Sequence, residues 1–301
     1  MKKYILYILL FLGIVAGIDV GFGKAFDYLN IHANKGEYKK LYDVCQNNHY
    51  DLVILGSSRA CHHYIPDIIA DSTGLTCYNA GFDGNGVILS CGILQLILER
   101  YKPKCIVFDV EPAFDIEEYA ADNNNTRYLA LLKPFYKHDC VRRIFNDIAE
   151  SEYIKQYSSL VRHNSKSFNV LLSYLSYNDK KERNGYIPLS GFMEGHSIQP
   201  AEIQRLDDLK IRYFNKLLNI AKSNNIPIVV IYSPKFERTY KETMDTIVRI
   251  CAENDIIFWD YSNQNEYLNT KLFKESMHLN EEGATLFSQE IGARIDSIVN
   301  N

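Results

Sequence analysis

The sequence predicts an α/β fold built on a mainly parallel sheet of five strands. Short apolar runs alternate with helical patterns along most of the 301-residue chain, which indicates βαβ units with right-handed crossovers. The runs are apolar on both faces, as expected for strands that are covered by helices on each side. Polar and glycine-rich motifs follow several runs, at the strand ends where open α/β sheets place their working residues.

Five strands and five helices account for the regular part of the predicted fold. The strands are Asp51–Leu55, Thr76–Asn79, Cys105–Val110, Pro227–Tyr232 and Ile256–Asp260. The helices lie near Tyr64–Ser72, Val87–Arg100, Ala201–Ser223, Glu237–Asn254 and Glu281–Val299. We expect these elements to form one domain over residues 49–301.

Residues 115–200 interrupt the alternation of strands and helices. This segment is rich in Tyr and Asn, with helical patterns near Cys140–Tyr157 and Ser167–Tyr177 and a turn-rich tail at Asn178–Gln199. We interpret it as a helical insertion that caps the strand ends. Residues 24–48 are predicted to form a polar, partly helical lead-in.

The N-terminal segment is expected to lie outside this fold. Two lysines precede Tyr4–Ile18, an apolar run that stops at Asp19 and resumes weakly at Val20–Phe22. With Asp19 near the far interface, the segment is long enough to cross a bilayer, and the lysines favour a cytoplasmic N-terminus. We predict a single-pass signal anchor at 1–23 in the cytoplasmic membrane, with the rest extracytoplasmic (periplasmic or cell surface). A cleaved signal peptide and a buried helix are the alternatives.

Charge and cysteine content exclude several classes of protein. The net charge is −4 and no basic block follows the first residues, so nucleic acid is not expected as a partner. The glycine spacing does not fit a dinucleotide-binding fingerprint. No CxxC pair and no metal-ligand spacing with His occurs, so we predict no metal, no cofactor and no disulfide framework. The cysteines of apolar segments are expected to be small buried residues: Cys77, Cys91 and Cys105.

A serine follows the first predicted strand. The segment Asp51–Arg59 is an apolar strand that runs into Gly56, Ser57 and Ser58. Glycine lets the backbone turn sharply, and the free N–H groups of a following helix would then point at Ser58. The alternative is that one of the serines only caps the helix.

A glycine-rich segment follows the second strand. Asn79–Gly86 contains three glycines in its last six residues, which indicates unusual dihedral angles or a close approach of the backbone to a ligand. Backbone N–H groups in such a loop can stabilise an oxyanion. A plain turn into the next helix is the alternative.

A histidine lies just before the last helix. Asn280 is a suitable N-cap for this helix, so His278 falls in the loop before it, near the expected carboxyl ends of the sheet. Glu275 precedes it by three residues and could accept the Nδ1 proton. A serine, a histidine and a carboxylate are the groups needed for nucleophilic acyl transfer. A solvated loop histidine is the alternative.

Together these blocks resemble the SGNH/GDSL hydrolases. The similar segments are Gly-Ser-Ser-Arg, the following Asn-x-Gly-x-x-Gly and the C-terminal carboxylate-x-x-His-Leu-Asn, in the same order along about Asp51–Asn300. The resemblance implies a three-layer α/β/α sandwich of flavodoxin-like topology and ester hydrolysis or acyl transfer through an acyl-serine. It implies that Ser58 is the nucleophile and one oxyanion donor, Gly84 a second donor, His278 the base and Glu275 its carboxylate partner. Ser57 and Arg59, which flank the nucleophile, are assigned to the oxyanion and substrate-binding set.

The chain departs from the family pattern in three places. Ser57 stands where an Asp is usual, and Glu275 is one methylene longer than the usual Asp. After the third strand the family supplies an Asn donor, whereas this chain has Phe108–Ala113 without an Asn. Loss of one oxyanion donor costs about 3 kcal/mol of transition-state stabilisation. Asn85 is the nearest residue that could replace it.

Three functions remain open at this stage. The first is an extracytoplasmic serine esterase or O-acyltransferase, of O-acetyl groups in particular, acting on a cell-envelope polysaccharide or other glycan. The second is a non-catalytic glycan-binding or assembly protein on the same scaffold, which the missing Asn favours. The third is a cytoplasmic α/β enzyme whose apolar start is accidental. Protein partners are not indicated by any motif.

Overall fold

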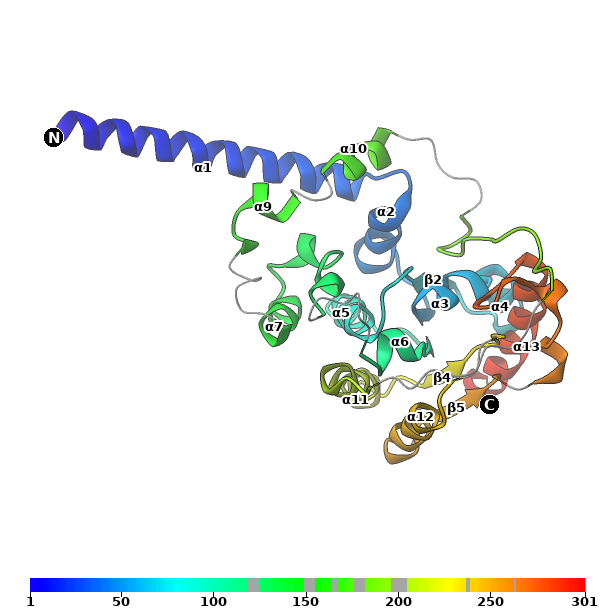
Figure 1. The fold of residues 1–301 in the computed structure, drawn as a ribbon. Helices are drawn as coiled ribbons and strands as arrows, with labels where there is room; N and C mark the ends of the chain where they lie inside the picture. The colour runs from blue at the N-terminus through cyan, green and yellow to red at the C-terminus, as the bar shows by residue number, and fades with distance from the viewer. Residues whose placement is uncertain are drawn as a thin grey trace. The chain divides into compact units, whose positions relative to one another are not determined.

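The computed structural model describes residues 1–118, 125–148, 155–163, 167–175, 182–195, 205–236, 239–262 and 264–300. The chain divides into two compact units, which are described separately (Figure 1). The first unit comprises 1–42 and 124–179, and the second comprises 43–123 and 180–301.

The second unit contains a five-stranded parallel sheet. Its strands are β1 Leu52–Gly56, β2 Cys77–Gly81, β3 Cys105–Asp109, β4 Ile228–Tyr232 and β5 Ile257–Asp260. They lie in the order β2-β1-β3-β4-β5, and all four neighbouring pairs are parallel. This is the flavodoxin-like order of a doubly wound sheet.

Helices cover both faces of this sheet. They are α3 Ser58–His63, α4 Pro66–Thr73, α5 Val87–Leu98, α6 Pro112–Asp115, α11 Asp208–Ser223, α12 Lys241–Glu253 and α13 Glu281–Val299. One face carries α4 and α13, which pack against each other, and the other carries α5 and α11 (Figure 1). The predicted α/β sandwich with a parallel five-stranded sheet is therefore confirmed.

The interior strands are buried because both of their faces meet helices. Alternate residues of a strand point to opposite faces. Leu52 and Ile54 of β1 thus join Ile69 of α4 and Ile291 of α13 in one core cluster, while Val53 and Leu55 are buried towards the other layer. Cys77, Cys91 and Cys105 are buried too, as the sequence predicted.

The predicted strands agree with the observed ones to within two residues at each end. The helices predicted at Val87–Arg100 and Glu281–Val299 also correspond to α5 and α13. The predicted helix Tyr64–Ser72 is α4, but the separate short helix α3 that precedes it was not predicted. Parts of the other predicted helices and of the tail lie outside the described residues: 149–154, 176–181, 196–204 and 237–238.

A two-stranded hairpin and short helical turns complete the second unit. The hairpin pairs β6 Phe273–Glu275 with β7 His278–Leu279 in antiparallel register. The turns are η1 Asp43–Asn47, η4 Asn265–Tyr267 and η5 Thr270–Leu272. The hairpin directly precedes α13, so it carries the C-terminal candidate residues.

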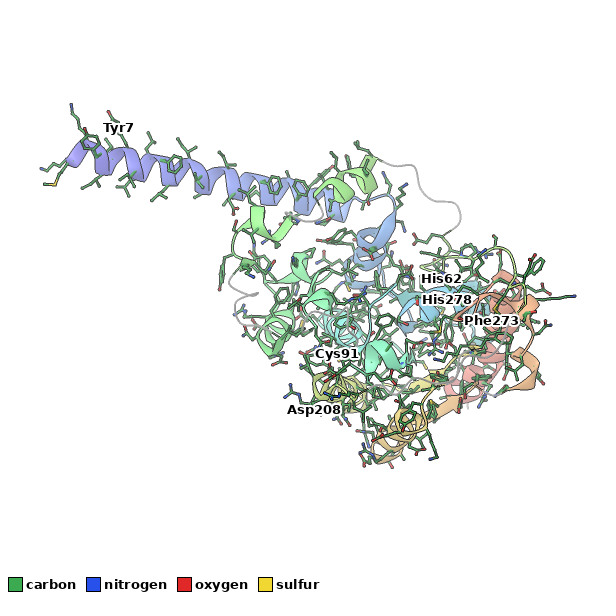
Figure 2. All side chains as sticks on the ribbon, viewed as in Figure 1. Tyr7, His62, Cys91, Asp208, Phe273 and His278 are labelled. Carbon is green, nitrogen blue, oxygen red and sulfur yellow. The ribbon has the colours of Figure 1, made fainter. Side chains whose placement is uncertain are left out.

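The first unit is entirely helical in its described part. It contains α1 Lys2–Ile31, α2 Gly36–Tyr42, η2 Thr126–Leu129, η3 Lys133–Phe135, α7 Asp139–Ile148, α9 Ser159–His163 and α10 Ser167–Leu175. Among the described helices, α1 alone is long and apolar enough to cross a membrane, a test that a signal sequence also passes. Its first residues, Tyr7 among them, expose their side chains (Figure 2).

The first unit joins two segments that the sequence analysis kept apart. Helix α1 continues well beyond residue 23, and its last half packs against α9 and α10. The predicted segments were separate: an anchor at 1–23, a lead-in at 24–48 and an insertion at 115–200. Only the three-dimensional contacts reveal that the lead-in and part of the insertion bury surface together.

Gly56 ends the central strand with a backbone conformation that favours glycine. Its φ angle is +141°, and an added Cβ would lie 2.6 Å from the Asp109 carbonyl oxygen and 2.9 Å from the Ala60 Cβ. Both obstacles are rigid, so the chain cannot relax cheaply. The sharp turn predicted at Gly56 is thus a requirement of packing between β1, β3 and α3.

Replacement of Gly56 by Ala is expected to destabilise the protein by about 3 kcal/mol, because backbone strain and overpacking add. The matched control is Gly74→Ala, where φ is +69° but no atom lies within 4 Å of the added Cβ; it should cost about 1 kcal/mol. Urea unfolding of both variants measures the difference. Equal losses would contradict the steric part of this account.

Candidate active site

Ser58 is the first residue of α3, directly after the turn that ends β1. Its side chain is partly exposed, while the neighbouring Ser57 and Arg59 are buried. The first N–H groups of a helix have no acceptor inside the helix, so the N–H of Ser58 lies beside its own hydroxyl and is free of the helical ladder. Ser57 occupies the N-cap position of α3, but it makes no side-chain capping hydrogen bond.

His278 meets Ser58 across 220 residues of chain. The Ser58 hydroxyl lies 2.8 Å from His278 Nε2, and His278 Nδ1 contacts a carboxylate oxygen of Glu275. The carboxylate accepts from Nδ1–H, which leaves Nε2 as the acceptor for the serine proton. The structure therefore brings together all three residues that the sequence proposed for acyl transfer.

The carboxylate of Glu275 is kept ionised by its surroundings. Partial burial raises its pKa, but the hydrogen bonds from His278 and from the Met277 N–H outweigh burial, and the net pKa is lowered. A charged carboxylate on Nδ1 stabilises the imidazolium that forms when Nε2 takes a proton. The extra methylene of Glu is accommodated by the hairpin, in which Glu275 and His278 are directly paired.

His63 holds the hairpin against α3. Its Nε2 accepts the N–H of Leu279 at 3.0 Å, so its Nδ1–H donates to Ser233 Oγ at 3.0 Å. Burial, followed by the charges of His278 and Arg59, lowers the pKa of His63 well below 6.5. The ring is therefore neutral at physiological pH, and it fixes the residue next to the catalytic candidate His278.

The buried neutral ring of His63 predicts a pH dependence of stability. In the unfolded chain His63 takes up a proton below about pH 6.5, whereas the folded state resists protonation. Its contribution is complete above about pH 6.5 and is lost as pH falls, by up to about 1.4 kcal/mol per pH unit. His63→Gln should flatten this acid limb in denaturant titrations between neutral and mildly acidic pH. An unchanged slope would contradict the assignment.

His62 connects the base to the glycine-rich turn. His62 and His278 lie next to each other (Figure 2). Their rings are close to perpendicular, with centroids 5.3 Å apart. The His62 Nδ1–H donates to the Ile187 carbonyl at 2.7 Å, and the His62 Nε2 faces Asp83 Oδ1 at 3.3 Å. The His62 side chain therefore contacts both His278 and the turn that carries Gly84.

The glycine-rich turn has the two candidate oxyanion residues at its tip. Gly84 has a φ of +62°, and the Asn85 side-chain amide donates to the Asp83 carbonyl at 2.9 Å. The Asn85 amide is thus bonded within its own turn. A donor role for either residue remains a prediction.

Close packing fixes both ends of this turn. An added Cβ at Gly81 would lie 2.5 Å from the Cys61 nitrogen, and one at Gly86 would lie 2.4 Å from the Phe114 carbonyl oxygen. The predicted close approach of the backbone therefore occurs, but its partners are α3 and α6 rather than a ligand. Asn79 strengthens the first contact, since its side-chain amide donates to the carbonyl oxygens of Ala60 and Tyr64.

Arg59 and Ser57 do not contribute to a substrate surface, which corrects the assignment made from the sequence. Arg59 is fully buried, with Nε 2.6 Å from a carboxylate oxygen of Glu111 and Nη1 donating to the Ser233 carbonyl at 2.9 Å. The buried Oγ of Ser57 has no hydrogen-bond partner. Both side chains are fully buried, whereas Ser58 is partly exposed.

The segment after β3 is used for structure and not for an oxyanion donor. Asp109 is fully buried between Arg59 and the Tyr64 hydroxyl, which donates to it. Burial raises the pKa of Asp109 to about 6, although Arg59 and the hydrogen bonds act in the opposite direction. The segment in which the resembled family has an Asn donor therefore contributes to a buried network of charged residues in this chain.

The roles of His62 and His63 were missed in the sequence. The signal was present, because two consecutive histidines follow the serine by four and five residues, so that His62 shares a helix face with Ser58. One group of metal-ligating atoms also occurs within the described residues: Cys61, His62 and Asp83 lie within 4.8 Å of one another. Asp83 is exposed, and the acyl-transfer chemistry of Ser58 and His278 does not require an ion there.

Comparison with known proteins finds two solved structures of low similarity. No protein-family model matches the chain, and no curated protein matches it. A Bacteroides fragilis protein proposed to be an acylhydrolase is similar, with 14% identity, a TM-score of 0.38 and coverage of 82% of this chain and 87% of that one. A Desulfitobacterium hafniense protein proposed to be a lipolytic G-D-S-L member has 9% identity, a TM-score of 0.36 and coverage of 81% and 99%. At these values the assignment of the site depends on the contacts of this chain's own residues.

Proposed function

We propose that the protein is a serine esterase or O-acyltransferase that works through an acyl-serine on Ser58. The observation that carries the proposal is the contact of 2.8 Å between Ser58 Oγ and His278 Nε2, with Glu275 on the other ring nitrogen. These three residues come from the end of β1 and from the hairpin before α13, so the fold itself brings them together.

The first half of the reaction forms the acyl-enzyme. His278 Nε2 takes the proton of the Ser58 hydroxyl while Oγ bonds to the ester carbonyl carbon, and the carbonyl oxygen becomes an oxyanion. The N–H of Ser58 and that of Gly84 are the proposed donors to this oxyanion. The intermediate collapses when the carbon–oxygen bond to the alcohol breaks and the departing oxygen takes the proton from His278.

The second half transfers the acyl group to an acceptor. Water or a sugar hydroxyl gives its proton to His278 Nε2 and attacks the acyl carbon. The bond to Ser58 Oγ then breaks, and Oγ takes the proton back. Glu275 stays ionised throughout and stabilises the charged ring in each half.

A non-catalytic glycan-binding or assembly protein is the second candidate. The observation that favours it is the use of Asp109 and Glu111 in a buried network with Arg59, where the related hydrolases place an Asn donor. Serine-directed chemistry separates the two candidates.

A fluorophosphonate probe is expected to label the wild-type protein and not Ser58→Ala, because only an activated serine attacks the phosphorus. Ser57→Ala is the matched control, since its hydroxyl is buried beside the nucleophile and should not react. Labelling is measured by intact-protein mass. Folded protein that gives no adduct would favour the binding candidate.

Turnover of a model ester tests the histidine and its carboxylate. His278→Ala should lower p-nitrophenyl acetate turnover by about 10³-fold, because general-base catalysis is lost. Glu275→Gln should lower it less, because the carboxylate is half-exposed and water can take its place. Equal turnover in wild type and both variants would defeat the mechanism.

We propose a cell-envelope glycan as the acylated or acceptor molecule. A pocket of about 590 Å³ begins at Asn280, two residues after His278, within the usual size range of ligand pockets. It combines an exposed aromatic ring with charged, amide and hydroxyl groups, which suits the apolar faces and hydroxyls of sugars. Its lining consists of Leu189, Ser190, Gly191, Phe192, Lys271, Asn280, Glu281 and Glu282.

We propose further that α1 is a retained anchor rather than a cleaved signal. The second half of α1 belongs to the folded first unit, where Gly23 packs so closely on α9 that an added Cβ would lie 2.3 Å from Ser159 Oγ. Asn30 is fully buried in the same helix. Helix α1 runs without a break from the apolar run into these packed residues, and this continuity supports retention of the run.

The membrane fraction is expected to contain the full chain, with an N-terminus at Met1 or Lys2. We expect this because α1 runs without a break from the apolar run into the residues that pack on α9, Asp19 and Gly23 among them. Intact mass and N-terminal sequencing of the membrane-extracted protein measure this. A mature N-terminus after residue 18 would contradict the anchor.

A further inference from the structure

The apolar run of α1 is short for the bilayer that it is proposed to cross. Tyr4–Ile18 corresponds to about 22 Å at 1.5 Å per residue, against a hydrocarbon core of about 30 Å. The far boundary of the core must therefore lie close to Asp19, with Val20 and Phe22 completing the span. Whatever is bound to Asp19 lies at that boundary as well.

Asp19 is bound to the start of α9. Its carboxylate accepts hydrogen bonds from the Ser158 hydroxyl at 2.8 Å and from the N–H groups of Ser159 and Leu160 at 2.9 Å each. These bonds satisfy the charged group where water is scarce, and they fix the depth of α9 relative to the end of the apolar run.

Helix α9 has one face towards α1 and an apolar face away from it. Ser159 and His163 face α1, since Ser159 meets Gly23 and the His163 ring lies 5.3 Å from that of Phe26. Leu160 and Val161 are apolar and exposed, at 40% and 47% exposure. Tyr157, just before the helix, is 65% exposed.

We propose that Tyr157, Leu160 and Val161 form a membrane-contact surface that lies in the lipid interface beside α1. The occupant is the phospholipid bilayer, because the surface is fixed by Asp19 at the level where the apolar run of α1 ends. Apolar and tyrosine side chains are favoured at that depth. This inference rests on the proposed anchor role of α1, and it assigns part of the insertion to lipid binding.

The test measures the depth of single tryptophans in the full-length protein reconstituted in vesicles. The native tryptophan, Trp259, is first replaced by Phe. Leu160→Trp and Val161→Trp are then compared in vesicles with acyl chains brominated near the headgroup. Both are expected to show blue-shifted emission and a loss of intensity to the bromines.

Two further tryptophans calibrate the measurement. Phe11→Trp, in the middle of the apolar run, should be quenched by deeply brominated chains. Asn146→Trp, on the exposed polar face of α7, should be quenched by neither. If Phe11→Trp is quenched but the α9 tryptophans emit like Asn146→Trp, the membrane-contact surface is overturned while the anchor stands. Release of the protein by alkaline carbonate would overturn the anchor, and the surface with it.

Asp19→Leu tests whether the hydrogen bonds of Asp19 fix the depth of α9 in the membrane. Leucine lengthens the apolar run but removes all three hydrogen bonds to α9. The variant should remain in the membrane, whereas Leu160→Trp in the same chain should lose its quenching. Retention of full quenching would overturn the role of Asp19.

Discussion

The contact on which the candidate site depends is the hydrogen bond from the Leu279 N–H to His63 Nε2. His63 and Ser58 lie on the same short helix, α3. The bond therefore ties the hairpin that carries His278 to the element that carries the serine. Since His63 is neutral and fully buried, the bond is not screened by solvent and is not broken by a proton at neutral pH.

The side chain of Arg59 attaches the same helix to the ends of two strands of the sheet. Its guanidinium contacts Asp109 at the end of β3 and Glu111 just after that strand, and it donates to the carbonyl of Ser233 after β4. A buried charge that keeps its partners is tolerated, whereas removal of one partner leaves an uncompensated charge. Two contacts therefore fix α3 in place: the ion pairs of Arg59 attach it to the sheet, and the hydrogen bond of His63 attaches it to the hairpin. This explains how a helix of six residues can hold a serine at hydrogen-bonding distance from its base.

The sequence predicted the parts of the molecule that depend on local pattern. Apolar runs bounded by turn residues located every strand of the parallel sheet, and the position of Asn280 located the start of α13. The pairing of Ser58 with His278 followed from strand ends that must share one edge. Arg59 was misassigned because a charged residue beside a nucleophile is normally exposed, and its partners are far away in the sequence, from Asp109 to Ser233. The packing of α1 on α9 was out of reach for the same reason, since Asp19 and Ser158 are related only by tertiary contact.

The geometry also bears on the choice between hydrolysis and transfer. The His278 and Glu275 side chains are 21% and 49% exposed, so water can reach the base that would activate the acceptor. Water at its bulk concentration outcompetes a dilute sugar hydroxyl unless the sugar is held next to the acyl-serine. In the proposed mechanism, transfer therefore requires that an acceptor hydroxyl be held next to the acyl-serine on Ser58. Without a bound acceptor, the same three residues would act as an esterase.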